Sequence, residues 1–107
     1  MKCIKSQSIS VVGTNLVITL PSNVSLSENE YFYIILCQCI PSDASTLPVV
    51  FEIGATEYNG LNRIGNTLRA DQLRCRYRYC GVYGVDNPHI MIKSHVPETK
   101  YINEVIK

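Results

Sequence analysis

The sequence predicts an all-β fold, a small antiparallel β-sandwich or barrel of about seven short strands. Short apolar runs rich in β-branched and aromatic residues are separated by Gly, Pro and Asn, and no long segment repeats with a helical period. The chain has 107 residues, 46% of them hydrophobic, which is enough for one domain with its own core. We therefore predict a single β domain over residues 1–97 and a C-terminal tail over residues 98–107.

The first half of the chain contains a predicted hairpin and a predicted interior strand. Residues 8–20 form two apolar runs around the turn residues 13–15. After a polar loop, residues 31–40 are apolar on both alternating faces, a pattern typical of a strand that is covered on both sides. A short buried helix is the alternative for this run, because periodicity alone does not separate the two.

The dipeptide Asn59-Gly60 is the clearest turn signal in the chain. A two-residue type I′ turn needs a positive φ at both central positions, which Asn and Gly adopt most readily. Residues 56–58 should therefore pair with residues 61–63. Gly54, which follows a strand predicted over residues 49–53, indicates a bulge or a bend.

Two more strands are predicted over residues 73–83 and 89–94. Tyr77, Tyr79 and Tyr83 should lie on the inner side of the first of these strands, with their hydroxyl groups at the edge of the core. In the tail, Tyr101 and its neighbours have helical spacing, which predicts a short amphipathic C-terminal helix.

The charges are segregated along the chain although the net charge is only +1. Residues 1–60 carry two positive and five negative charges. Residues 61–78, which we call the arginine segment, carry five arginines and one aspartate. The small net charge gives no overall field that would hold nucleic acid or a membrane surface, so any electrostatic recognition must depend on this segment.

Within the arginine segment, an extended strand over residues 73–79 would place Arg74, Arg76 and Arg78 on one face. Three guanidinium groups in a row need solvent, carboxylates or phosphates between them. Three interpretations follow: a solvated outer face, an interface, and a phosphate-binding surface for single strands. The last is weakened because the same alternation places the tyrosines behind the arginines.

The candidate interaction surface comprises all the arginines of the chain: Arg63, Arg69, Arg74, Arg76 and Arg78. Arginine is enriched at protein interfaces because its planar guanidinium group is weakly hydrated and binds carboxylates in a fixed geometry. In the interface interpretation, the arginines pair with acidic residues of another copy. The candidates are Glu28, Glu30, Glu52 and Glu57.

The five cysteines are predicted to be reduced and buried in the core, because their number is odd and no export signal is recognised. The spacing of Cys37 with Cys39 and of Cys75 with Cys80 does not match a zinc knuckle, so a metal site is disfavoured. No pattern around the two histidines marks an activated thiol. We therefore expect no enzymatic activity, no metal and no cofactor.

An arginine-rich pattern is combined with turn residues in the later part of the chain. It comprises residues 61–66, 68–74 and 79–84, followed by Pro88-His89. Over approximately residues 30–96 this pattern resembles small accessory virion proteins of tailed phages and prophages of gut bacteria. The resemblance implies a compact all-β structural protein without enzymatic activity. Such a protein decorates a capsid or joins a head or tail structure.

The first functional hypothesis is accordingly a phage-type accessory virion protein that self-associates, or docks on other virion proteins, through its arginine-bearing strand. The alternative is an OB-like module that binds single-stranded nucleic acid. The run over residues 31–40 is too short to cross a bilayer as a helix. We therefore expect the protein in the virion, after assembly in the host cytoplasm, or in the cytoplasm if it is not viral, and not in a membrane.

Overall fold

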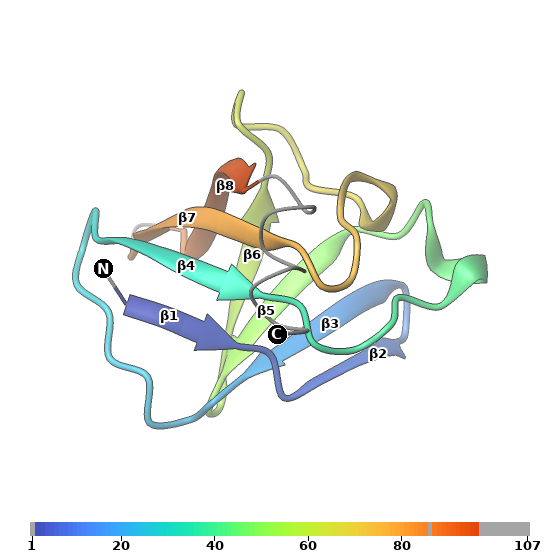
Figure 1. The fold of residues 1–107 in the computed structure, drawn as a ribbon, viewed down its shortest axis with the longest axis horizontal. Helices are drawn as coiled ribbons and strands as arrows, with labels where there is room; N and C mark the ends of the chain where they lie inside the picture. Colours follow the sequence, from blue (N-terminus) through green and yellow to red (C-terminus); the bar gives the residue numbers. More distant parts are fainter. Residues whose placement is uncertain (1, 86, 97–107) are drawn as a thin grey trace, which may run out of the picture.

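The strands of the computed structural model, which describes residues 2–85 and 87–96, form one curled sheet (Figure 1). The all-β prediction is confirmed, and the predicted C-terminal helix lies outside the described residues. The eight strands are β1 (Lys2–Lys5), β2 (Ser8–Val12), β3 (Asn15–Leu20), β4 (Tyr31–Ile35), β5 (Val49–Ile53), β6 (Thr56–Leu61), β7 (Arg78–Gly84) and β8 (His89–Val96). Two short 3-10 helices are η1 (Ser42–Ala44) and η2 (Ala70–Gln72). None of the helical segments in the described part of the chain has the length and hydrophobicity that a membrane span requires.

The strands are hydrogen-bonded in the order β1-β4-β7-β8-β6-β5-β3-β2. Three neighbouring pairs are parallel: β1 with β4, β3 with β5, and β6 with β8. The prediction of an antiparallel fold is therefore wrong for these pairs. A tight hairpin cannot join parallel neighbours, and each of these pairs is indeed separated along the chain by at least one other strand.

The N-terminal segment joins the two ends of the strand order. β1 and β2 follow each other in sequence, yet β1 pairs with β4 and β2 pairs with β3 (Figure 1, blue). The change of partner occurs at two residues: the N–H of Ser6 donates to the carbonyl of Ile35 at 2.9 Å, and the N–H of Gln7 donates to the carbonyl of Thr19 at 2.7 Å. Ser6 is buried, and its hydroxyl accepts a 2.9 Å hydrogen bond from the N–H of Cys37. These bonds fix the point at which the chain passes from one end of the strand order to the other.

The core lies inside the curl of the sheet. Alternate residues of the strands point inward, and the largest fully buried side chains include Leu16, Ile18, Phe32, Ile34 and Phe51. Tyr79 belongs to the same buried cluster, and Tyr77 and Tyr83 pack against it. The prediction that one strand carries all three tyrosines is wrong, because Tyr77 precedes β7.

The strand predicted over residues 31–40 is shorter than expected. β4 ends at Ile35, and the chain leaves the sheet after Leu36. Its interior position between β1 and β7 is confirmed. The prediction that both faces are covered is wrong at the start of the strand, where Tyr31 is 49% exposed, whereas Ile35 on the same face is buried.

The predicted turn at Asn59-Gly60 is also wrong, because β6 runs through both residues. The turn lies instead at Gly54, which has a φ of 61° and connects β5 to β6. Gly60 is buried, and a Cβ atom at this position would lie 2.7 Å from the carbonyl oxygen of Val49. Close packing of this backbone therefore explains the glycine, and the local turn preference is overridden.

Candidate interaction site

The arginine segment does not form the predicted continuous strand. Residues 73–77 lie outside the strands, and β7 begins only at Arg78. The chain turns at Arg76, whose φ of 69° is a left-handed value that interrupts extended backbone. The N–H of Arg76 donates a 2.6 Å hydrogen bond to the carbonyl of Leu36, which holds the turn. An alternating pattern predicts the sides that residues take only where the chain is extended, so this local turn overrides it.

The structure consequently places the three alternating arginines in different surroundings. Arg74 and Arg76 are exposed and precede β7, whereas Arg78 is half-buried in it. The guanidinium carbon of Arg78 lies 4.7 Å from the centroid of the Tyr33 ring, which is a cation–π contact. The predicted row of three outward-facing guanidinium groups is therefore wrong.

The other two arginines are exposed on separate turns. Arg63 lies in the turn that follows β6, and Arg69 directly precedes η2. The guanidinium group of Arg69 donates a long, 3.4 Å hydrogen bond to the carbonyl of Thr46. In the part of the chain that the structure describes, no ion pair is formed by the exposed guanidinium groups of Arg63, Arg74 and Arg76.

Arg74 lies beside two tyrosines in a polar depression of about 280 Å³. The lining residues are Asp71, Gln72, Arg74, Tyr77 and Tyr79. The two tyrosine rings are stacked, with centroids 6.0 Å apart and planes at 22°. The N–H of Arg74 donates a 2.7 Å hydrogen bond to the hydroxyl of Tyr79, and burial raises the pKa of Tyr79 to about 12. The expectation that the tyrosines lie behind the arginines is therefore wrong for Arg74.

A second depression, of about 470 Å³, shares Arg74 with the first. It is lined by Cys39, Ile40, Leu73, Arg74 and Cys75. Cys39 and Cys75 therefore border the same hollow. Burial, and then the neighbouring Cys39 thiol, raises the pKa of the Cys75 thiol. The turn at residues 73–77 thus brings cysteines together that the sequence separates widely.

The prediction that the cysteines fill the core is wrong. Cys3, Cys37 and Cys39 are exposed, and Cys75 and Cys80 are half-buried. The inner positions of the strands hold larger Ile, Leu, Phe and Val side chains instead. Among the side chains that the structure describes, no group of three or more histidines, cysteines or carboxylates is placed to hold a metal ion.

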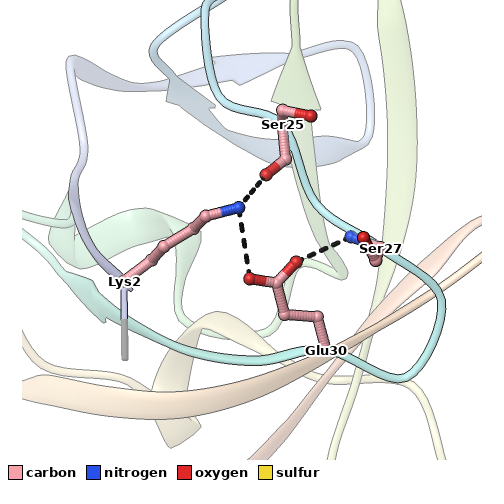
Figure 2. A network of polar contacts seen from close by, with 4 residues as sticks. All are labelled: Lys2, Ser25, Ser27 and Glu30. Carbon is pink, nitrogen blue, oxygen red and sulfur yellow. Dashed lines mark hydrogen bonds and ion pairs between the residues drawn. The ribbon is translucent and has the colours of Figure 1, made fainter.

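Glu30, one of the predicted acidic partners of the arginines, is engaged within the chain (Figure 2). One of its carboxylate oxygens lies 3.2 Å from Nζ of Lys2, and the other accepts a 2.7 Å hydrogen bond from the N–H of Ser27. Lys2 also donates to the carbonyl of Ser25, so the network ties β1 to the loop before β4. The hydrogen bond from Ser27, and then the contact with Lys2, lower the pKa of the Glu30 carboxyl.

Glu52 and Glu57 form a like-charged pair, because they are directly opposite each other on β5 and β6. Glu52 accepts a 3.3 Å hydrogen bond from the hydroxyl of Thr19, and within the described residues no cation forms an ion pair with either carboxylate. The pairing of Glu52 with Glu57 is not predicted from the sequence, because the Asn59-Gly60 signal places the turn after these residues. The signal that would have found it is Gly54, where the chain actually turns.

Comparisons with known proteins were made for the whole chain. No family model matches the sequence, and neither a curated protein nor a solved structure matches it. The features that bear on function are therefore the arginine segment, the two depressions and the carboxylates of Glu52 and Glu57.

Proposed function

We propose that this protein is a non-enzymatic accessory virion protein that self-associates through its arginine segment. The observation that carries the proposal is the exposure of Arg63, Arg74 and Arg76 with no ion pair among the described residues. Guanidinium groups in this state are suited to bidentate contacts with carboxylates of a partner. The resemblance of residues 30–96 to accessory virion proteins supports the same class of function.

The acidic half of the molecule supplies a matching partner surface. Glu52 and Glu57 place two carboxylates side by side on β5 and β6, at a cost to the isolated chain. In an assembly, the acidic pair of one copy would lie against the arginines of the next. The repulsion between the two carboxylates would then fall, and the arginines would gain ion-pair partners. Glu28 and Glu30 contribute less, because Glu30 pairs with Lys2 and Glu28 accepts a 2.8 Å hydrogen bond from the N–H of Val85.

The test is the mass of the particle in solution, measured by light scattering over a series of protein concentrations. We expect the wild type to exceed the monomer mass and Arg74→Glu to shift it toward the monomer. Lys5→Glu is the matched control, because it makes the same charge change at an exposed position outside the arginine segment. A wild type that stays monomeric at every concentration, or an equal effect of both variants, would contradict the proposal.

A second candidate function is binding of single-stranded nucleic acid, which the first depression favours. Arg74 and the half-buried Tyr77 line the same hollow, so a phosphate and a base could be contacted together. A labelled oligothymidylate should then bind more weakly as salt rises. Tyr77→Ala should cost ~1–3 kcal/mol of binding free energy, whereas Tyr31→Ala on β4 should cost nothing. Absence of binding at low salt would exclude this candidate.

A further inference from the structure

Two cysteine-bearing segments run side by side beyond the last residues of the β4–β7 ladder. Ile35 pairs with Arg78 at the end of that ladder. Leu36 continues the pairing, because its N–H donates to the carbonyl of Tyr77 at 3.3 Å and its carbonyl accepts from the N–H of Arg76 at 2.6 Å. Cys39 lies three residues after Leu36 on one segment, and Cys75 directly precedes Arg76 on the other. Both cysteines line the depression that borders these segments.

The two cysteines line the same depression but differ in exposure. Cys39 is exposed, whereas Cys75 is half-buried, and both line the depression of about 470 Å³ together with Arg74. Burial, and then the neighbouring Cys39 thiol, raise the pKa of Cys75, while the positive charge of Arg76 acts in the opposite direction. Cys39 is thus the thiol that a dissolved oxidant meets first, and Cys75 is placed to react second.

We infer that Cys39 and Cys75 form a redox modification site, in which a low-molecular-weight disulfide such as glutathione disulfide converts them reversibly into an intramolecular disulfide. The inference does not rest on the proposed self-association, although Cys75 belongs to the arginine segment and Arg74 lines the same depression. The geometry excludes the pairing of Cys3 with Cys80. Cys3 and Cys80 both pair with Tyr33 from opposite sides, so their strands are two positions apart, about 9–10 Å, which is too far for a disulfide.

The chemistry consists of two successive thiol–disulfide exchanges. The Cys39 thiolate attacks one sulfur of glutathione disulfide, the S–S bond breaks, and a glutathione thiolate leaves and takes up the proton that Cys39 released. The Cys75 thiolate then attacks the Cys39 sulfur of the mixed disulfide, and the second glutathione leaves with the proton from Cys75. Two protein thiols are oxidised to one disulfide, and one glutathione disulfide is reduced to two glutathione molecules.

The test equilibrates the full chain with mixtures of reduced and oxidised glutathione, then blocks remaining thiols and analyses the protein by mass spectrometry. We expect two of the five thiols to be lost, the intact mass to fall by two hydrogens, and a linked peptide pair to contain Cys39 and Cys75. Excess reduced glutathione should restore both thiols. A different linked pair, or a stable glutathione adduct on Cys39 of the wild type, would overturn the inference.

Three variants and one further probe sharpen the experiment. Cys75→Ser should stop at a glutathione adduct on Cys39, and Cys39→Ser should prevent the internal disulfide. Cys3→Ser, at another exposed cysteine, should leave the Cys39–Cys75 disulfide unchanged. Phenylarsine oxide bridges neighbouring thiols, so it should protect both Cys39 and Cys75 of the wild type from alkylation. Failure of that protection in the folded wild type would contradict the inference even if a variant failed to fold.

Discussion

Glu57 lies directly across the β5–β6 pair from Glu52, so two carboxylates share one outer patch of the sheet. Like charges in this cross-strand arrangement oppose strand pairing. Replacing Glu57 with lysine creates an opposite-charge pair instead. We expect Glu57→Lys to raise the free energy of unfolding by ~0.2–1 kcal/mol, measured by urea denaturation of the monomer at low salt.

Two control variants separate the local pair from a general effect of charge. Glu57→Gln removes the repulsion without adding an attraction and should lie between the wild type and Glu57→Lys. Thr56→Lys adds a positive charge at the neighbouring exposed position, which pairs with Ile53 and not with a carboxylate. If Thr56→Lys stabilised the protein as much as Glu57→Lys, the explanation by the cross-strand pair would be wrong.

The sequence predicts correctly those elements whose local strand and turn signals agree with the tertiary packing. The hairpin over residues 8–20 is such a case: β2 and β3 flank a turn at Gly13, whose φ is 61°. The turn at Asn59-Gly60 and the strand over residues 73–77 fail because tertiary packing decides both. Neither the approach of the Val49 carbonyl to Gly60 nor the left-handed turn at Arg76 is encoded in a local pattern.

The sequence indicates which arginines are exposed but not how they are arranged. Clustering of arginine along the chain is visible in the sequence, and the exposure of Arg63, Arg69, Arg74 and Arg76 agrees with it. The contact between the Cys39 region and the arginine segment is not visible, because it joins segments far apart in sequence. Only the fold brings these segments together.

Gly60 provides a test of the finding that β6 continues through the Asn-Gly pair. A Cβ atom here would lie 2.7 Å from the carbonyl oxygen of Val49 and 3.3 Å from the Leu68 side chain. We expect Gly60→Ala to lower the free energy of unfolding by ~1–3 kcal/mol in urea denaturation, as overpacking does. Asn59→Ala at the exposed neighbour should change it little, whereas a type I′ turn would make both substitutions costly.

The network around Glu30 predicts a dependence of stability on pH. The hydrogen bond from Ser27 and the contact with Lys2 favour the ionised carboxylate and lower its pKa from the ordinary 4.5. The stabilisation is therefore complete above that ordinary value and is lost as the pH falls through the lowered pKa of the folded state. Urea midpoints of the wild type and Glu30→Gln should differ at neutral pH and converge in acid.

The control for this prediction is Asp43→Asn, which neutralises an exposed carboxylate in η1. It should leave the pH dependence of the urea midpoint close to that of the wild type. A constant difference between the wild type and Glu30→Gln over the whole acid range would show that the loss comes from packing and not from the charge of Glu30.

The hydroxyl groups of Tyr58 and Tyr83 are 3.0 Å apart, and their ring centroids are 5.2 Å apart. The hydrogen bond with Tyr58, and then burial, raises the pKa of Tyr83 to about 12. Because the neutral form is favoured in the folded state, the stabilisation is complete below pH 10, the ordinary pKa, and is lost as the pH rises through about 12.

Tyr58→Phe should therefore lower the pKa of Tyr83, as followed by the ring-carbon NMR signal of labelled tyrosine. Tyr31→Phe, at an exposed tyrosine of β4, should leave that signal unchanged, and a wild-type Tyr83 that titrates at the ordinary value would refute the contact.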